Sequence, residues 1–257
     1  YPVKSMLGEE LNATAVTDRG VLGDRAFALV DTPTGKVASA KNPRRWPNLF
    51  DFRAAVIEPL PDKGSLPPVR ITFPDGATVT TDQSDVDARL GAVLGRPVRL
   101  ACSAMAAAIA EGYWPDYDWL PHRDEVFDFP LPPGTFFDGA TIHLVTTATL
   151  DRLRAANRAS RFEIPRFRPN FVIEPAHGSD GFVEKGWIGR TLTLGEVQLR
   201  IDGLCPRCVM TTLSQGRLPK DPAVLRTSVQ ENRANVGVYA SVLRGGCMRR
   251  GDSVEIS

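Results

Sequence analysis

The sequence has few of the residues from which disulfide frameworks and metal clusters are built. Four cysteines and three histidines are spread over 257 residues, too few for a disulfide-stapled secreted fold, so a reducing, cytoplasmic location is expected. His143, between Ile142 and Leu144, is interpreted as a hydrogen-bonded structural residue rather than a ligand. No apolar run reaches the ~20 residues that a membrane-spanning helix needs, and no membrane partner is expected.

The chain also lacks an excess of charge of either sign. Its formal net charge is +1, with charged residues making up 24% of the sequence, so nothing favours nucleic acid as a partner. The basic residues Lys41, Arg44 and Arg45 near Trp46 are interpreted as a solvated loop. A glycine-rich phosphate loop of the Walker or Rossmann kind is missing. Any anion site must therefore come from locally placed lysines and arginines.

What the sequence does contain is a series of short β-type segments separated by turns. Two hairpins are predicted: at 69–81, where Pro-Asp-Gly separates VRITF from ATVTT, and at 191–201, where Gly195 begins the turn. Further strands are expected at 26–30, 37–40, 53–58, 141–145, 169–173, 236–242 and 252–256.

Helix signals are fewer. Ser84 and Asp87 resemble a capping box before a helix that Gly95 ends, with one face made of Val86, Leu90, Val93 and Leu94. A second helix is predicted over 147–157, with a threonine as its cap and with Leu150 and Leu153 inward. Many strands, few helices and no βαβ alternation predict a mainly β (α+β) fold, barrel-like, with attached helices.

Residues 112–136 are crowded with prolines, aromatics and acids and show no clean period. Two interpretations stay open. The segment is either a surface loop at a domain boundary or a lid over a cleft, with Trp114, Tyr117 and Trp119 touching a substrate. We accordingly expect an N-terminal β-rich part over residues 1–120 and a C-terminal domain over 121–257.

The stretch LCPRCVMTT places Cys205 and Cys208 three positions apart. A structural zinc site needs four ligands, and a second pair is missing. A thioredoxin-like dithiol would open a helix in a βαβ unit, whereas VMTT is β-leaning. A pair of buried structural thiols and one activated thiolate both remain possible from the spacing. Arg207 favours the activated thiolate, because a cationic neighbour lowers the pKa of a thiol.

Five segments strengthen that interpretation through their order along the chain: YPVKS (1–5), GVLGDRAFALVD (20–31), FRPNFVIE (167–174), CPRCVMTT (205–212) and NVGVYASVLRGGCMRRGDSVEI (235–256). Together they resemble the MOSC family, named for the C-terminal domain of molybdenum-cofactor sulfurase. The similarity is greatest to members with an N-terminal β-rich MOSC domain, such as the mitochondrial amidoxime-reducing components. It implies a MOSC β-barrel and a bound molybdenum cofactor (molybdopterin).

The resemblance implies roles for ten residues. Cys208 falls on the position that ligates molybdenum, and would be the metal ligand and the catalytic residue. The residues on cofactor-binding positions are Lys4, Ser5, Arg25, Thr146, Thr147, Arg168, Asn170, Pro206, Arg207 and Cys208 itself. Arginine forks and a lysine charge suit a pterin phosphate. We expect these side chains to converge in a groove between the two parts of the chain.

Within CPRC, Cys208 rather than Cys205 is expected to be the functional thiolate. If CVMTT is a strand, alternation directs the two sulfurs differently. Arg207 directly precedes Cys208 and would favour its anionic form. Cys205 would then be a packing residue.

The function that the resemblance implies is molybdenum-dependent reduction of N-hydroxylated compounds: amidoximes, hydroxylamines or N-hydroxylated bases. The alternatives are a sulfur-carrier or cofactor-handling protein that uses a Cys208 persulfide, and a binding module without catalysis. The chain has no C-x₄-C-x₂-C iron–sulfur spacing and no nicotinamide or flavin fingerprint. A separate electron donor is therefore expected, ferredoxin-like, cytochrome-like or a flavin reductase.

Overall fold

The computed structural model describes residues 1–57, 66–102 and 108–257. By internal contacts the chain forms two compact units. Unit 1 comprises Tyr1–Glu10 and Gly23–Gly139, and unit 2 comprises Leu11–Leu22 and Ala140–Ser257. Strands outnumber helices in both units, which confirms the mainly β fold class. The predicted domains over 1–120 and 121–257 stay a prediction.

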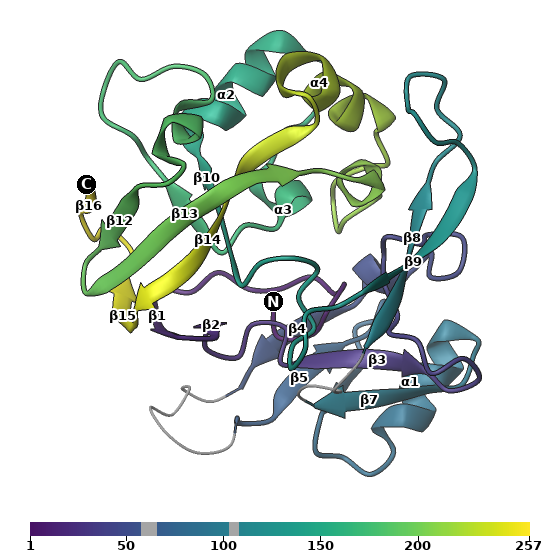
Figure 1. Ribbon diagram of the computed structural model, residues 1–257. Coiled ribbons are helices and arrows are strands. Elements are labelled where there is room, and N and C mark those ends of the chain that lie inside the picture. Colours follow the sequence, from purple (N-terminus) through teal and green to yellow (C-terminus); the bar gives the residue numbers. More distant parts are fainter. Residues whose placement is uncertain (58–65, 103–107) are drawn as a thin grey trace. The chain divides into compact units, whose positions relative to one another are not determined.

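Unit 1 is made of small antiparallel sheets and the helix α1 (Figure 1). Strand β3 pairs with β7, strands β4, β5 and β6 form a three-stranded sheet, and β8 and β9 form a hairpin. The elements are β3 (Phe27–Asp31), η1 (Leu49–Asp51), β4 (Arg53–Val56), β5 (Val69–Thr72), β6 (Thr78–Thr80), α1 (Val86–Leu94), β7 (Val98–Cys102), β8 (Ile109–Trp114) and β9 (Glu125–Pro130).

All but one of the strands predicted in unit 1 are confirmed. The 69–81 hairpin is β5 and β6, the strand at 26–30 is β3, and the strand at 53–58 is β4. The last residue of the 53–58 prediction lies outside the described residues. The strand at 37–40 is wrong: Val37 forms isolated bridges to Val30 and Ala110, and no strand continues from it.

The segment 112–136 is more regular than predicted. Its flanks form the antiparallel hairpin of β8 and β9, which is visible as a long paired ribbon in Figure 1. The aromatic side chains contact one another: Trp114 stacks on Phe127 at 5.8 Å between ring centroids, and Tyr117 stacks on Trp119 at 5.0 Å. Cross-strand pairing, which the mixed composition conceals, orders this part of the chain.

Helix α1 has the predicted end but not the predicted start. Gly95 ends it in the left-handed conformation with φ 68°. The N-cap is Asp85 instead of Ser84, and Asp87 accepts a hydrogen bond from the backbone N–H of Leu100 at 2.7 Å instead of closing a capping box. Val86 and Leu90 are buried as expected, whereas Val93 is 43% exposed.

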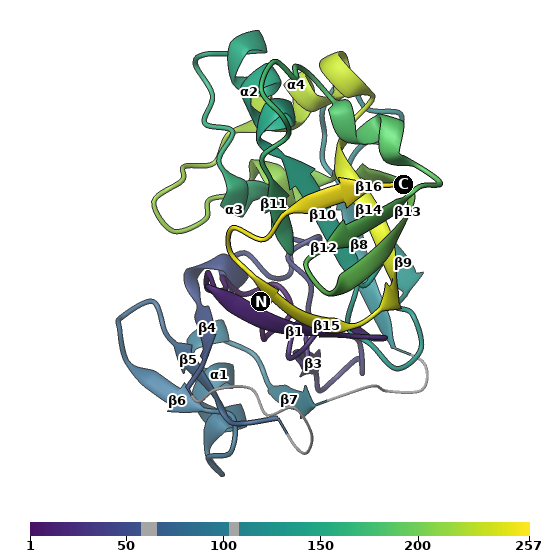
Figure 2. The same cartoon turned by 90° about the vertical axis from the view of Figure 1, so that its left-hand side faces the viewer.

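Unit 2 is organised around a six-stranded sheet with the order β11-β10-β14-β13-β12-β16 (Figures 1 and 2). The β10–β11 pair is parallel and the other pairs are antiparallel. Strands β15, β1 and β2 form a smaller sheet. The elements are β1 (Ala13–Thr17), β2 (Gly20–Val21), β10 (Ile142–Thr146), α2 (Thr147–Ala156), α3 (Ile164–Phe167), β11 (Phe171–Ile173), η2 (Val183–Trp187), β12 (Thr191–Leu194), β13 (Val197–Pro206), η3 (Val209–Thr212), α4 (Pro222–Asn232), β14 (Asn235–Arg244), β15 (Gly246–Arg249) and β16 (Val254–Ile256).

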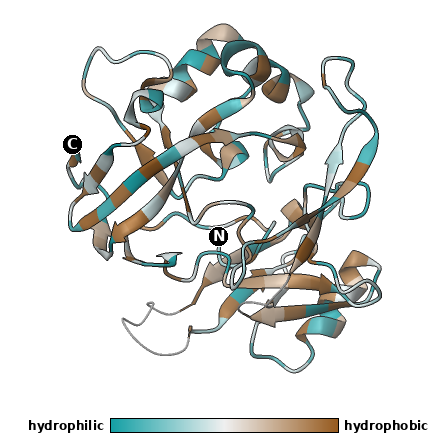
Figure 3. Ribbon diagram, viewed as in Figure 1, coloured by the Kyte–Doolittle hydropathy of each residue, from teal (hydrophilic) through white to brown (hydrophobic). Residues whose placement is uncertain are grey.

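Apolar residues alternate with polar ones along β12 and the first part of β13, as a half-buried strand requires, whereas β10 is buried along its whole length (Figure 3 gives the hydropathy). One core is formed mainly by side chains of the sheet itself, including Leu144, Leu199, Ile201 and Val238. A second core lies where helices pack on the sheet and contains Val145, Leu150, Leu153, Phe162, Phe167, Val224 and Val236. Helices α2 and α4 lie side by side in both views, which places their apolar faces on this second core.

The sequence-based predictions for unit 2 are confirmed except in one segment. The 191–201 hairpin is β12 and β13, with Gly195 at φ 55°. The expected strands appear as β10, β11, β14 and β16, and the helix at 147–157 is α2. CVMTT, however, is not a strand. Residues Val209–Thr212 form the 3₁₀ helix η3, with Cys208 as its extended N-cap.

Candidate functional site

Cys208 lies on a turn between the end of β13 and the start of η3. Its side chain is half-buried. Its carbonyl oxygen accepts hydrogen bonds from the backbone N–H of Thr211 at 3.2 Å and from the hydroxyl of the same residue at 3.0 Å. Pro206, two positions before it, is exposed and pairs in register with Asn235 of β14. The main chain of Cys208 is therefore fixed by hydrogen bonds just beyond the end of strand β13.

A buried arginine that the sequence reasoning missed supports this turn. Arg166 is fully buried. Its guanidinium donates to four main-chain carbonyls, those of Arg161 at 2.8 Å, Thr211 at 3.1 Å, Leu213 at 3.3 Å and Pro219 at 2.8 Å. Two of these carbonyls belong to the segment just after Cys208. The spacing of the arginines around FRPN does not reveal that Arg166 is the one that is fully buried.

Arg168 and Asn170 follow helix α3 in the same unit. Arg168 is 5% exposed and adopts the left-handed conformation with φ 52°. The side-chain oxygen of Asn170 accepts the backbone N–H of His143 at 2.9 Å, and its own N–H donates to the His143 carbonyl at 2.8 Å. Asn170 thus joins β11 to β10, and its side-chain oxygen is occupied by the main chain.

Thr146 and Thr147 are at the junction of β10 and α2. The Thr146 hydroxyl donates to Glu184 at 2.8 Å and accepts the Thr149 N–H at 3.1 Å, and Thr149 also donates to Glu184 at 2.6 Å. Glu184 is 1% exposed. The Thr146 hydroxyl is therefore committed to the helix cap and to a buried carboxylate that the sequence reasoning missed. Thr147 is half-buried in the first turn of α2.

Arg207 has a partner that the sequence did not predict. Its Nη1 donates to the sulfur of Cys205 at 2.7 Å and its Nη2 to the carbonyl of Phe167 at 2.9 Å. Cys205 is fully buried, as expected of a packing residue. Burial disfavours its thiolate, but Arg207 and His143 outweigh burial and lower the pKa of Cys205 from 9.0 to about 6. Arg207 thus interacts more strongly with the first cysteine of CPRC than with the second.

The predicted residues of unit 1 form their own group. Lys4 is 5% exposed, and its ammonium donates to the carbonyl of Phe136 at 2.8 Å and to Asp138 at 2.5 Å. Burial lowers the pKa of Lys4, and Asp138 opposes that effect. The Ser5 hydroxyl, also buried, accepts the backbone N–H of Ala40 at 3.0 Å. Asp138, which the sequence reasoning missed, is therefore the direct partner of a predicted phosphate-binding lysine.

Arg25 is held in place by an acid and two aromatic rings. It forms an ion pair with Asp24, and its guanidinium lies 5.2 Å from the ring centroid of Tyr1 and 5.5 Å from that of Phe137. Its φ is 49°, in the left-handed region that non-glycine residues seldom adopt. Such conformations persist where surrounding contacts stabilise them.

The basic residues that were interpreted as a solvated loop form ion pairs, and the Arg44 side chain is 55% exposed. Lys41, Arg44 and Arg45 each contact a carboxylate, and the partners are Asp138, Asp124 and Asp31 in that order. Burial opposes ionisation of Asp138, but Lys4 and Lys41 hold its pKa well below the usual range. Asp138 is therefore an anion shared by two lysines.

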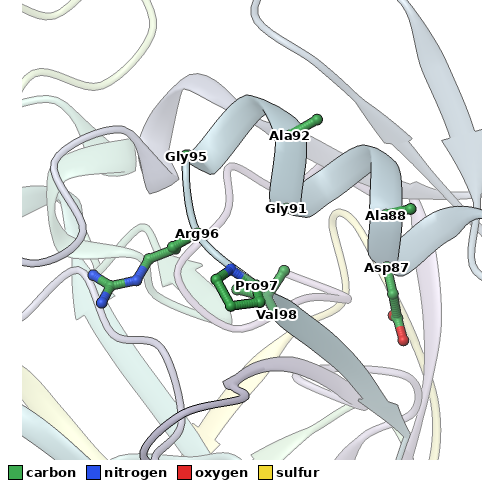
Figure 4. A pocket seen from close by; sticks show the side chains of 8 residues that line it. All are labelled: Asp87, Ala88, Gly91, Ala92, Gly95, Arg96, Pro97 and Val98. Atoms are coloured by element: carbon green, nitrogen blue, oxygen red, sulfur yellow. The ribbon is translucent and has the colours of Figure 1, made fainter.

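A shallow pocket of 510 Å³ lies elsewhere in unit 1, against helix α1 (Figure 4). Both of its charged side chains are already engaged: Asp87 accepts from Leu100, and Arg96 contacts Asp31 at 3.2 Å and the Trp46 ring. The pocket contains none of the predicted site residues. Its lining is Asp87, Ala88, Gly91, Ala92, Gly95, Arg96, Pro97 and Val98.

Across the described ranges, no three His, Cys, Asp or Glu side chains gather in a way that could hold a metal ion. All four cysteines are free thiols. None of the helices in the described part of the chain is long and apolar enough to cross a membrane.

Comparison with known proteins gives two family matches. The model of the MOSC domain matches residues 133–255, and the model of the MOSC N-terminal beta barrel domain matches residues 1–103. Mitochondrial amidoxime reducing component 2 of Rattus norvegicus is 30% identical over 132 residues, which are 46% of this chain and 37% of that protein. The protein of the same name from Homo sapiens is 27% identical over 148 residues, 52% of this chain and 41% of that protein.

Molybdenum cofactor sulfurase of Drosophila pseudoobscura pseudoobscura is 30% identical over 96 residues, 34% of this chain and 12% of that protein. The chain therefore spans less than half the length of each of these three relatives. The two matched domains together account for most of its residues. The chain belongs to the MOSC domain family, in the form that also has a MOSC N-terminal beta barrel domain.

Proposed function

We propose that this protein binds a molybdenum cofactor and reduces N-hydroxylated compounds such as amidoximes, hydroxylamines and N-hydroxylated bases. Membership of the MOSC family supports the cofactor. The relatives named amidoxime reducing component support the reaction. The single observation that carries the proposal is the Cys208 turn, which presents a half-buried thiol directly after Arg207 on a main chain stabilised by Arg166.

The residues near this turn fit an anionic cofactor. Nε of Arg207 is buried and has no hydrogen-bond partner among the described residues. An unsatisfied buried donor costs about 1–3 kcal/mol, and an acceptor on a ligand removes that cost. Arg168, which is 5% exposed, adds a second guanidinium in the same unit. A cysteine thiolate is a soft ligand that suits a transition metal.

In this proposal Cys208 ligates the metal, and the organic part is held by the remaining predicted residues. A bound molybdenum cofactor supplies the two-electron redox chemistry. The net reaction takes two electrons and two protons, breaks the N–O bond, and leaves an N–H bond and water. The chain's own residues bind the anion, orient it and neutralise its charge. Lys4 has to share its ammonium with Asp138 in order to take part.

The electrons come from a separate donor protein in this proposal, ferredoxin-like, cytochrome-like or a flavin reductase. Reduction of a hydroxylamine should therefore require a reduced iron–sulfur, cytochrome or flavin donor. Turnover of the purified protein with NADH alone would contradict the need for a separate donor.

The cytoplasmic location stays a prediction.

Replacing Cys208 is the direct test. Cys208→Ala should lower the rate of amidoxime reduction by more than ~100-fold, because the metal loses its protein ligand. The rate is measured with protein made in cells competent for cofactor synthesis, alongside molybdenum and pterin content. Cys247→Ala, an exposed thiol on β15, is the matched control and should keep the parent rate. Full activity in Cys208→Ala overturns the assignment.

The similarity to molybdenum cofactor sulfurase favours one second candidate, a sulfur carrier that uses a Cys208 persulfide. Mass spectrometry of the intact protein after incubation with a sulfur donor separates the two. A persulfide on Cys208 in a protein that reduces no N-hydroxylated compound supports the carrier. Turnover without a persulfide supports the reductase.

A further inference from the structure

Cys205 has a contact that packing alone does not require. Its side chain is fully buried near the end of β13, and Nη1 of Arg207 lies 2.7 Å from its sulfur. Arg207 is half-buried and Cys205 is fully buried, so a guanidinium beside this sulfur is a costly arrangement unless the two groups compensate each other. The contact indicates a charge-assisted pair of thiolate and guanidinium.

Three neighbouring segments surround the sulfur with groups that stabilise a negative charge. Arg207 follows β13, His143 comes from β10 and Tyr239 from β14, and all three lower the pKa of Cys205 to about 6 against the effect of burial. Strand order brings them together, because β14 pairs with β10 on one side and with β13 on the other. Cys205 in turn raises the pKa of Arg207, although burial opposes this.

The pair with Cys205 determines which hydrogen-bond donors of Arg207 stay available to a ligand. Nη1 is held by Cys205, Nη2 by the Phe167 carbonyl at 2.9 Å, and the backbone N–H by Ala234 at 2.7 Å. Nε is the buried donor left without a partner among the described residues. Phe167 is the residue before Arg168, so the same guanidinium also connects the Arg168 segment to the end of β13.

We propose that Cys205 is a positioning residue whose thiolate fixes the guanidinium of Arg207, so that Nε of Arg207 serves as a donor to the anionic cofactor. Arg207 then binds the ligand through Nε, in addition to its electrostatic interaction with Cys208, which is weaker than that with Cys205. The cofactor part of this inference rests on the proposed function. The pair itself is a property of the cofactor-free protein, and the two parts can be tested apart.

The pair is tested by titrating Cys205 without cofactor. A variant with Cys102→Ser, Cys208→Ser and Cys247→Ser keeps Cys205 as its single thiol. Ultraviolet thiolate absorbance should rise with a midpoint near 6, well below the ordinary 9.0. Adding Arg207→Gln should raise the midpoint by at least about one unit, because the main charge partner is lost. A midpoint at or above 9.0 with Arg207 in place would contradict the thiolate–guanidinium pair. So would a midpoint that Arg207→Gln leaves unchanged.

The positioning role is tested by cofactor content. Cys205→Ser and Arg207→Gln should each lower bound molybdenum and pterin about ten-fold, and the double variant should bind no less than Arg207→Gln alone, because the two residues act as one unit. Cys102→Ser, an exposed thiol, should keep the parent content. Full cofactor content in Cys205→Ser, with loss in Arg207→Gln, overturns the role. If the parent protein binds no cofactor, the proposed function and this role fall together, while the titration still decides the pair.

Discussion

Two arginines two positions apart, Arg166 and Arg168, have different environments. Arg166 is fully buried and donates to four carbonyls, and burial lowers its pKa. Arginine suits this place because its planar fork has five donors, which can satisfy several carbonyl dipoles at once. Arg168 is buried in the left-handed conformation just beyond α3. The first stabilises the Cys208 turn, and the second is the candidate for ligand contact.

Arg166→Lys should therefore destabilise the protein although it keeps the charge. A lysine ammonium has three donors on a flexible stem, so at least one carbonyl is left unsatisfied and the buried charge is poorly compensated. We expect the free energy of unfolding to fall by about 3 kcal/mol, measured by urea denaturation. Arg154→Lys, on the exposed face of α2, is the control and should change it by less than ~0.5 kcal/mol. Equal stability of the two variants contradicts the role given to Arg166.

At the scale of elements, strand β14 can lie against β10 because one of its residues has no side chain. Gly237 has φ 81°. A Cβ at this position would lie 2.2 Å from the carbonyl oxygen of Leu144 and 2.6 Å from Nε2 of His143. His143 is buried and its Nε2 is 3.0 Å from the Val236 carbonyl, as expected of a hydrogen-bonded structural histidine. The glycine thus leaves the space that the histidine ring occupies.

Gly237→Ala should be strongly destabilising. Both the positive φ and the close approach to main-chain atoms disfavour alanine, and a loss of about 3 kcal/mol or more in the free energy of unfolding is expected. Gly203→Ala is the matched control in the neighbouring strand β13, since a Cβ there meets no heavy atom of the described residues within 4 Å. Thermal and urea unfolding check both variants. A Gly237→Ala protein as stable as Gly203→Ala would show that β14 can shift to accommodate the methyl group.

At the scale of the whole molecule, each unit holds part of the predicted cofactor-binding set. Lys4, Ser5 and Arg25 belong to unit 1, whereas Arg168 and Cys208 belong to unit 2. Within its own unit each group is supported by partly buried contacts, such as the pair of Lys4 with Asp138 and the pair of Arg207 with Cys205. That both groups contact the same cofactor molecule stays a prediction.

Removing one positive charge from each unit tests whether both groups bind the same cofactor. Lys4→Gln and Arg168→Gln should each weaken cofactor binding by about ten-fold or more, since a charge-assisted hydrogen bond contributes roughly 1.5–3 kcal/mol. The controls are Arg70→Gln on β5 of unit 1 and Arg154→Gln on α2 of unit 2, both exposed. Equilibrium binding of the pterin cofactor is measured for all four. Loss in only one unit would restrict the cofactor site to that unit.

The sequence by itself determined most elements whose signals are local. The turn at Gly195, the left-handed end of α1 at Gly95 and the cap of α2 at Thr146 all appeared where predicted. These features depend on the conformations of a few consecutive residues, so local chemistry is enough to predict them. The ordered motifs likewise indicated the MOSC family, which the family matches confirm. The hairpin of β8 and β9 was missed because its partner strands lie far enough apart to hide their pairing.

Only the tertiary structure decided which charged and polar groups meet. Lys4 pairs with Asp138, 134 positions away, and Thr146 pairs with Glu184, 38 positions away. Arg207 hydrogen-bonds to the sulfur of Cys205, two positions before it, and Val209–Thr212 forms a 3₁₀ helix rather than a strand. Side chains of residues that are adjacent in the sequence can point in different directions. Which buried charge a side chain reaches depends on how the strands are ordered in the sheet, and burial makes such pairing obligatory.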